Sequence, residues 1–418
     1  MAQVNKFINE PATNVPYFTP AQIPPAGTAV DPQPDGKPIP KLFQPIKIRG
    51  VEFQNRIWLS PLCQYSAKNG VPSPWQTAHL GGIITRGPGL SIVEATSVTP
   101  EGRITPEDLG LWNDEQAAKF AEIVTFAHSQ NQKIGIQLGH AGRKASTVTP
   151  WLSSRATATE EQDGWPNDVV APSAIRHSDG FPDPKELTKE GIQRIKQGFV
   201  DAAKRAVKAG FDVIEIHSAH GYLLHEFLSP VSNQRGDEYG GSFENRSRLS
   251  LEIVDAVRAV IPESTPLFYR ISATDRLENV MPNTPSWTVP DTIRLANLLA
   301  EHGVDLLDVS SAGTHPKQEI PAKIGDAFHA DLSEAVKAAI GDKLIVATVG
   351  GISNGKVAQA VLDKNQADVI FVGRHFQKNP GAVWQFAEDL DLRVTVAHQI
   401  GWGFFGRGVG RSRTATKN

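Results

Sequence analysis

The side chains best suited to chemistry are concentrated in residues 212–246, DVIEIHSAHGYLLHEFLSPVSNQRGDEYGGSFENR. The apolar, β-branched run Val213–Ile216 predicts a strand. His217, His220 and Tyr222 then occur within six residues, at the point where that strand should end. Two imidazoles and a phenol that converge at one strand end could bind an oxygen atom of a ligand.

The histidine pair allows three interpretations. Neutral imidazoles could donate two N–H bonds to a single carbonyl oxygen, as in an oxyanion hole. His217 and His220 could instead ligate a metal, with His225 as a third ligand, or they could be core histidines with satisfied hydrogen bonds. Tyr222 could donate a proton, because a phenol with a pKa near ~10 is protonated at neutral pH.

From Leu42 onward, apolar runs of strand length alternate with helical patterns, and eight such pairs can be counted. The predicted strands cover residues 56–60, 92–95, 134–138, 213–216, 267–271, 306–309, 344–347 and 369–372. The predicted helices cover residues 75–85, 114–130, 188–209, 244–260, 290–302, 331–340, 354–362 and 380–390. This alternation predicts an α/β fold, a parallel (β/α)8 TIM barrel. A doubly wound sheet is the alternative, but no G-x-G-x-x-G motif follows the first strand.

Three segments fall outside this repeat. Residues 1–40 are rich in proline, and we expect an extended N-terminal arm, most simply a solvated one. Residues 139–187, after the third strand, are too many for a simple connection and should form a lid or subdomain over the barrel mouth. Residues 396–418 should form a C-terminal tail, which leaves residues 41–395 for the barrel.

The bulk properties restrict the class of protein. The formal net charge of −3 gives no basic excess for nucleic acid or for an anionic membrane surface. The single cysteine, Cys63, excludes an intrachain disulfide and a cysteine-ligated iron–sulfur cluster within one chain. No apolar stretch reaches the ~18 residues that a membrane span needs, and no signal pattern opens the chain. We therefore expect a cytoplasmic protein that acts on small molecules.

The carboxyl ends of the strands should hold the active site of such a barrel. The seventh and eighth strands end in Gly350-Gly351 and Gly373-Arg374, at the two loops where barrels commonly bind phosphate. Glycines let backbone N–H groups approach an anion, and an arginine adds a charged hydrogen bond. Either pair alone could be an ordinary turn, but together they predict a phosphate site.

The other strand ends supply few metal ligands. They carry Ser60, Pro61, Cys63, Tyr65, Ala95, Gln137, His140 and Arg270. Metal sites at a barrel mouth usually add carboxylates or further histidines, so we expect no metal. Cys63 could be a small buried hydrophobe or could touch a cofactor.

Arg270 ends an otherwise apolar strand, and a buried arginine needs a partner. It could form a structural ion pair. It could also neutralise an anion on a ring near the barrel axis, such as the pyrimidine end of a reduced flavin. Gln137 could recognise the same donor–acceptor edge, or it could bond to backbone in the core.

Residues 351–355 match G-x-S-x-G, a pattern typical of a nucleophilic serine. Ser353 would then serve a hydrolase. The alternative is that Ser353 or Asn354 caps the following helix beside a phosphate. The hydrolase interpretation leaves Arg270, Gln137 and the histidine pair without a role, so we disfavour it.

Several stretches together resemble the old yellow enzyme family. They are SPLCQYS (60–66), GRITPEDLGLW (102–112), IQLGHAGRK (136–144), the run 217–246 and FVGRHF (371–376). The cysteine-containing motif SPLCQYS resembles the corresponding motif of the subclass called thermophilic-like. The resemblance, which spans residues 41–395, implies a barrel with tightly bound, non-covalent FMN that takes hydride from NAD(P)H. It further implies reduction of activated C=C bonds in enones and enals.

Carried over residue by residue, the resemblance implies roles for the strand-end residues. The flavin ring would be held by Ser60, Pro61, Cys63, Ala95, Gln137 and Arg270, and its phosphate by Gly350, Gly351, Gly373 and Arg374. His217 and His220 would bind the substrate carbonyl oxygen, Tyr65 would line that pocket, and Tyr222 would protonate the α-carbon. A flavoprotein isomerase or lyase, or a flavin-binding protein without turnover, is the alternative function.

One departure from the family concerns assembly. Relatives in the subclass often carry, two residues before a tryptophan, a C-terminal arginine that enters a neighbouring subunit's site. Ile400 stands at that position, before Gly401-Trp402, although Arg407 could substitute. The sequence therefore leaves open whether the chain forms a homo-oligomer, either a dimer or a tetramer.

Overall fold

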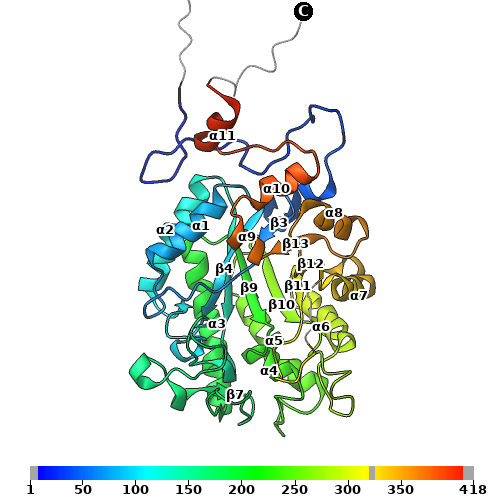
Figure 1. Cartoon of the computed structure of the whole chain (residues 1–418). Helices are drawn as coiled ribbons and strands as arrows, with labels where there is room; N and C mark the ends of the chain where they lie inside the picture. Colours follow the sequence, from blue (N-terminus) through cyan, green and yellow to red (C-terminus); the bar gives the residue numbers. More distant parts are fainter. Residues whose placement is uncertain (1–7, 320–324, 408–418) are drawn as a thin grey trace, which may run out of the picture.

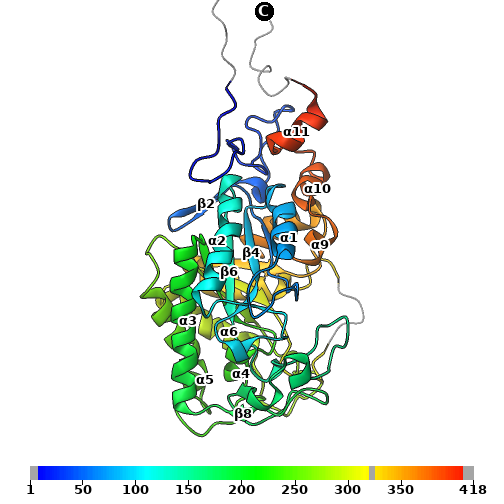
Figure 2. The same ribbon diagram turned by 90° about the vertical axis from the view of Figure 1, so that its left-hand side faces the viewer.

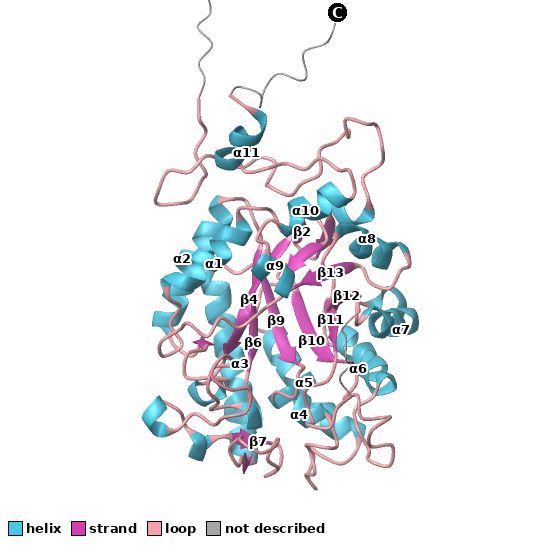
Figure 3. Cartoon of the chain, viewed as in Figure 1, coloured by secondary structure: helices cyan, strands magenta, loops and turns pink. Residues whose placement is uncertain are grey.

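Eight parallel strands close into a barrel in the computed structural model, which describes residues 8–319 and 325–407 (Figures 1 and 3). The strands are β3 (Ile57–Leu59), β4 (Leu90–Ser97), β6 (Ile134–Gly139), β9 (Val213–Ser218), β10 (Leu267–Ser272), β11 (Leu306–Ser310), β12 (Ile345–Val349) and β13 (Val369–Val372). Neighbours along the chain pair in parallel, and β3 pairs with both β4 and β13 to close the circle. The predicted (β/α)8 barrel is confirmed.

A helix follows each barrel strand and packs outside it. These helices are α1 (Pro74–Ile84), α2 (Asp114–Ser129), α3 (Lys189–Ala209), α5 (Phe243–Arg258), α6 (Val289–Glu301), α7 (Ala330–Ile340), α8 (Gly355–Asp363) and α10 (Ala382–Asp389). Local capping explains several boundaries: Asn113 caps α2 in a capping box, Thr188 caps α3, and Gly210 ends α3 with φ +95°. These three signals are readable in the sequence.

Strand β9 extends further than its apolar run suggests. It continues through His217 and Ser218, whereas the sequence pattern predicted an end at Ile216. The extra residues pair with β10, and His217 lies opposite Arg270. His217 is therefore fixed by the barrel sheet itself and does not lie on a loop.

Several short elements were not predicted from the sequence. They are the hairpin β1 (Ile46–Ile48) and β2 (Val51–Phe53), the short strands β5 (Leu109–Gly110), β7 (Val170–Ala171) and β8 (Lys185–Glu186), and the helices α4 (Leu223–Leu228), α9 (Arg374–Lys378) and α11 (His398–Phe405). Most are only two to six residues long, too short to show a periodic pattern. The hairpin β1–β2 packs Ile48 and Phe53 into one cluster with Trp58, which plugs the amino end of the barrel.

The N-terminal arm and the C-terminal segment meet at this amino end, at the top of Figure 1. Gly27 donates its N–H to the carbonyl of Thr395 at 2.9 Å, and Gln22 Nε2 donates to Gln399 Oε1 at 2.8 Å. Gln22 and Ala26 are buried. The expectation of a solvated arm is therefore wrong for the stretch from Thr19 to Ala29, whereas residues 8–18 are mostly exposed, and the domain boundary at residue 40 stays a prediction.

The long excursion, residues 139–187, lies at the opposite, carboxyl end of the barrel, where β7 is labelled near α4 in Figure 1 and β8 is labelled near α4 in Figure 2. Its own small apolar cluster includes Ala141, Ala145 and Val169, with Tyr222 packed against it. A lid function for residues 139–187 stays a prediction. Among the helices in the described part of the chain, none combines the length and apolar character needed to cross a bilayer.

Candidate active site

The two histidines and the tyrosine predicted from the sequence come together at the carboxyl end of β9. The ring of His217 lies 5.3 Å from that of His220 and 5.2 Å from that of Tyr222, edge-on in both cases. His217 belongs to the strand, whereas Tyr222 precedes the first residue of α4. His220 lies between them in the sequence and has φ +60°, a left-handed conformation that is unfavourable for a residue other than glycine.

Burial keeps all three side chains uncharged. It lowers the pKa of His217 and of His220 well below the usual value, and the nearby Arg270 adds to the effect. It raises the pKa of Tyr222 well above its usual value, with a further contribution from Cys63. The group therefore offers neutral imidazoles and a protonated phenol at neutral pH.

The backbone and Ser310 orient the two imidazoles. The Nδ1 atom of His217 accepts the N–H of Ala219 at 3.3 Å, which leaves the ring proton on Nε2. The Nε2 atom of His220 lies 2.8 Å from the hydroxyl of Ser310. Each ring thus has one nitrogen engaged, while the other makes no hydrogen bond to the residues that the structure describes.

A pocket lies beside His217 and Tyr222, and both residues line it. The loop after β4 lines it with Arg103, Ile104 and Asp108. Ala95 and His140, two further strand-end residues noted in the sequence, line it as well. The pocket therefore brings the ends of β4 and β6 and the loop after β4 together with the imidazole of His217 and the phenol of Tyr222.

The loop after β3 carries Cys63 and Tyr65. Burial raises the pKa of the Cys63 thiol, with smaller contributions from Asp108 and Glu94, so the thiol is protonated. Tyr65 has φ +47°, and its ring lies edge-on 5.7 Å from that of Trp151 in the excursion. Ser60 is fixed at the start of this loop, where its N–H bonds to Val372 on β13.

Gln137 and Arg270 both lie inside the barrel, and each faces an acid that the sequence reading overlooked. Gln137 Nε2 donates to Glu215 Oε1 at 2.8 Å. Arg270 Nε lies 3.1 Å from Asp308 Oδ2, so the ion pair considered from the sequence exists. A charged residue within an otherwise apolar strand, as in VIEI and LLDV, is the signal that could have revealed Glu215 and Asp308.

The glycine pairs adopt conformations that other residues avoid. Gly350 and Gly351 have φ +109° and +71°. A Cβ atom on Gly350 would lie 2.9 Å from Nδ1 of His329, and one on Gly351 would lie 2.2 Å from the carbonyl oxygen of Gly325. Gly373 and Arg374 form the start of α9, where the Arg374 side chain is exposed.

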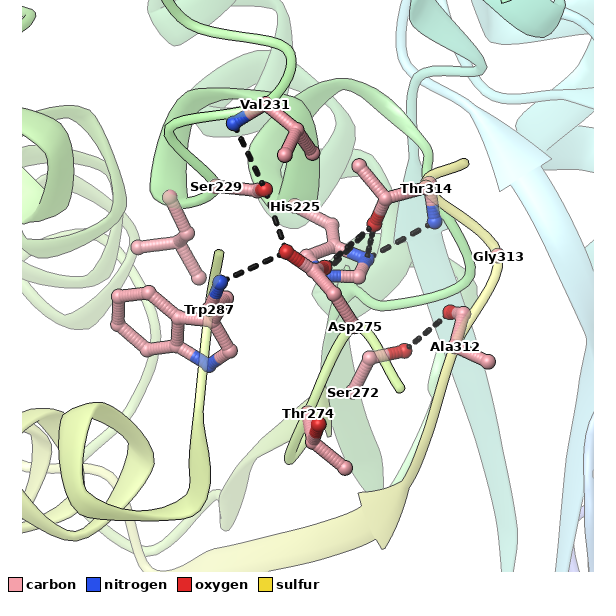
Figure 4. A network of polar contacts seen from close by, with 12 residues as sticks. His225, Ser229, Val231, Ser272, Thr274, Asp275, Trp287, Ala312, Gly313 and Thr314 are labelled. Atoms are coloured by element: carbon pink, nitrogen blue, oxygen red, sulfur yellow. Dashed lines mark hydrogen bonds and ion pairs between the residues drawn. The ribbon is translucent and has the colours of Figure 1, made fainter. Parts of the chain in front are cut away.

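Ser353 and His225 do not have the arrangements that the alternative interpretations required. Ser353 is exposed, and the cap of α8 is Asn354, whose side chain accepts the N–H of Val357 at 2.9 Å. Neither ring nitrogen of His225 is free, because Nδ1 accepts the N–H of Gly221 and Nε2 lies 2.9 Å from Asp275 Oδ1 (Figure 4).

Comparison with known proteins agrees with this geometry. Residues 41–393 match the model of the NADH:flavin oxidoreductase / NADH oxidase family. An NADH:flavin oxidoreductase of Gibberella zeae is 58% identical over 407 residues, which cover 96% of each chain. An NADPH dehydrogenase of Geobacillus thermodenitrificans is 40% identical over 369 residues, which cover 87% of this chain and 99% of the relative.

A solved structure supports the same relationship. The old yellow enzyme homologue of Zymomonas mobilis superposes with a TM-score of 0.66 at 29% identity, over 85% of this chain and 95% of that one. The resemblance drawn from the sequence is confirmed. The chain therefore belongs to the NADH:flavin oxidoreductase / NADH oxidase family, the old yellow enzyme family of FMN-dependent oxidoreductases that use NAD(P)H.

Proposed function

We propose that the chain is an ene-reductase, which reduces the C=C bond of α,β-unsaturated carbonyl compounds. The observation that carries this proposal is the convergence of the rings of His217, His220 and Tyr222, two of which, His217 and Tyr222, line the pocket. Two neutral donors for one oxygen and a nearby phenol match the needs of an enone, whose carbonyl must be polarised and whose α-carbon must gain a proton.

The residues present fit FMN. Gly350 and Gly351 both have positive φ, the backbone conformation found in loops whose N–H groups bind anions, and His329 and Gly325 leave no room for a Cβ atom at either position. Arg270 is buried on β10 with its guanidinium beside Asp308, and Gln137 lies on β6, separated from β10 by β9. We assign the ring to Ser60, Pro61, Cys63, Ala95, Gln137 and Arg270, and the phosphate to Gly350, Gly351, Gly373 and Arg374.

When bound, FMN would supply the redox chemistry that links oxidation of NAD(P)H to reduction of the alkene. Nε2 of His217 and the free nitrogen of His220 hold the carbonyl oxygen and withdraw electrons from the double bond. Tyr222 supplies the proton to the α-carbon, and its raised pKa keeps that proton available. Tyr65 closes the carbonyl pocket from the loop after β3.

The test begins with the purified protein, which should be yellow and release FMN on denaturation. The protein is reduced with NADPH without oxygen and then mixed with 2-cyclohexenone. Rapid reoxidation, with cyclohexanone as the product, supports the proposal. Reoxidation by oxygen alone, with the enone unchanged, would contradict it and would favour a flavoprotein without reductase turnover on enones.

A further inference from the structure

The turn that carries His220 is conformationally unfavourable and must be held in place. His220 and Gly221 both have positive φ, +60° and +70°. Left-handed backbone costs a non-glycine residue roughly 1–2 kcal/mol, and it persists only where the surroundings fix it. The contacts that fix this turn come from residues outside the pocket described above.

His225 connects the turn to a buried carboxylate (Figure 4). The N–H of Gly221 donates to Nδ1 of His225 at 2.9 Å, and Nε2 of His225 lies 2.9 Å from Oδ1 of Asp275. Because Nδ1 is the acceptor, the ring proton is on Nε2 and points to the carboxylate. His225 thus bridges Asp275 and the turn that carries His220.

Asp275 contacts four residues from three separate parts of the chain. Its Oδ1 atom also accepts from the hydroxyl of Thr314 at 2.8 Å, and Oδ2 accepts from Ser229 Oγ at 2.6 Å and from the N–H of Trp287 at 2.7 Å. All of these residues are fully buried. Burial alone would raise the pKa of Asp275, but the hydrogen bonds from His225, Ser229 and Trp287 outweigh it and hold the pKa below its usual value.

The segment after β11 that carries Thr314 is itself seated against the turn. A Cβ atom on Gly221 would lie 2.1 Å from the carbonyl oxygen of Gly313, and one on Gly313 would lie 2.1 Å from the carbonyl carbon of His220. Lys144 Nζ donates to the carbonyls of His220 and Gly313, at 2.8 and 3.3 Å. The two backbones therefore cannot move independently.

We propose that Asp275, acting through His225 and Thr314, is the positioning group that sets where His220 and Tyr222 meet the substrate. The network touches the turn from both sides, through Gly221 and through Gly313-Thr314. The side chains of Asp275, His225 and Thr314 do not line the pocket. The inference rests on the proposed function only in assigning the substrate oxygen to His220.

The test uses a pair of matched substitutions in the flavin-loaded protein, Thr314→Val and Thr292→Val. The hydroxyl of Thr292 is equally buried and bonds to Trp287 Nε1 and to the carbonyl of Ala273, but not to His225 or Asp275. Both variants should lose a similar amount of thermal stability, because each loses one buried hydroxyl. The control thus separates loss of stability from loss of positioning.

Only Thr314→Val should disturb the turn. We expect phenol, titrated by its effect on the flavin spectrum, to bind roughly five- to tenfold more weakly, the usual effect of disturbing one hydrogen bond. Deuterium uptake by a peptide that covers residues 218–224 should also increase. Thr314→Ser, which restores the hydroxyl, should return both values to those of the parent. If Thr314→Val does not fold, Thr314→Ala removes the same hydroxyl.

Unchanged phenol affinity and unchanged uptake in Thr314→Val, or equal changes in Thr292→Val, would overturn the proposal. Both readouts are independent of turnover. A parent protein that binds phenol but does not reduce 2-cyclohexenone would refute the ene-reductase assignment and still leave the positioning role measurable.

Discussion

Arg270 and Asp308 face each other across neighbouring strands inside the barrel, with Arg270 Nε 3.1 Å from Asp308 Oδ2 and the two residues in register. Glu215 lies close enough to contribute to the same electrostatics. Burial raises the pKa of both acids, and Arg270 opposes the rise in each. The nearby carboxyl groups of Asp308 and Glu215 therefore partly offset the positive charge of Arg270.

Replacing Asp308 should change the potential of the bound flavin. Asp308→Asn removes one negative charge beside Arg270, so the anionic reduced flavin should be favoured. We expect the midpoint potential to rise by roughly 30 mV, which corresponds to about 1.4 kcal/mol for a two-electron couple. Asp305→Asn is the control, because Asp305 pairs with Arg49 before the amino end of β11. An unshifted potential in Asp308→Asn, or an equal shift in both variants, would refute this electrostatic role.

Tyr222→Phe should separate the two half-reactions. Loss of the proton donor should slow reoxidation by 2-cyclohexenone by about 10²-fold or more, while flavin reduction by NADPH stays within about twofold of the parent. Stopped-flow absorbance of the flavin measures both steps. Tyr239→Phe, which removes a hydroxyl that bonds to Gln193 and Glu252, serves as the control. Equal damage to both half-reactions would argue against proton donation.

The enone step should depend little on pH. The pKa of Tyr222 lies above its usual value and the pKa of His217 and His220 below theirs. The phenol therefore keeps its proton as pH rises, and the imidazoles stay neutral as pH falls toward their ordinary pKa. We expect the reoxidation rate constant to be flat between about pH 6.5 and 10, the ordinary values for these side chains. A descending limb well below pH 10 that Tyr222→Phe removes would contradict the raised pKa.

Gly350→Ala should release FMN. The substitution forces alanine to φ +109° and places its Cβ 2.9 Å from Nδ1 of His329. Gly341→Ala is the matched control, since Gly341 also has positive φ but a Cβ there meets nothing within 4 Å. Gly341→Ala should lose about 1–2 kcal/mol of stability and Gly350→Ala more, because its Cβ also meets His329, whereas only Gly350→Ala should bind FMN at least about tenfold more weakly. The amount of flavin retained on gel filtration, followed by titration with FMN, measures this.

The sequence by itself determined the order of the barrel, because each apolar strand and each capped helix is a local signal. It also determined that His217, His220 and Tyr222 lie together, since they are separated by so few residues, and that glycines end β12 and follow β13. The short strands and helices, and the burial of the arm, were not predictable from periodicity.

Only the tertiary structure decided which groups face one another across strands and loops. Asp308 opposite Arg270, Glu215 beside Gln137, and Asp275 joined to the active-site turn through His225 are contacts between separate strands and loops. The first two contacts depend on strand register and on the position of each side chain along the barrel axis, which closure of the whole sheet sets. The third depends on how the loops pack at the carboxyl end of the barrel. A charged residue within an apolar strand predicts that a partner exists, but only the packing of the folded chain determines which residue that partner is.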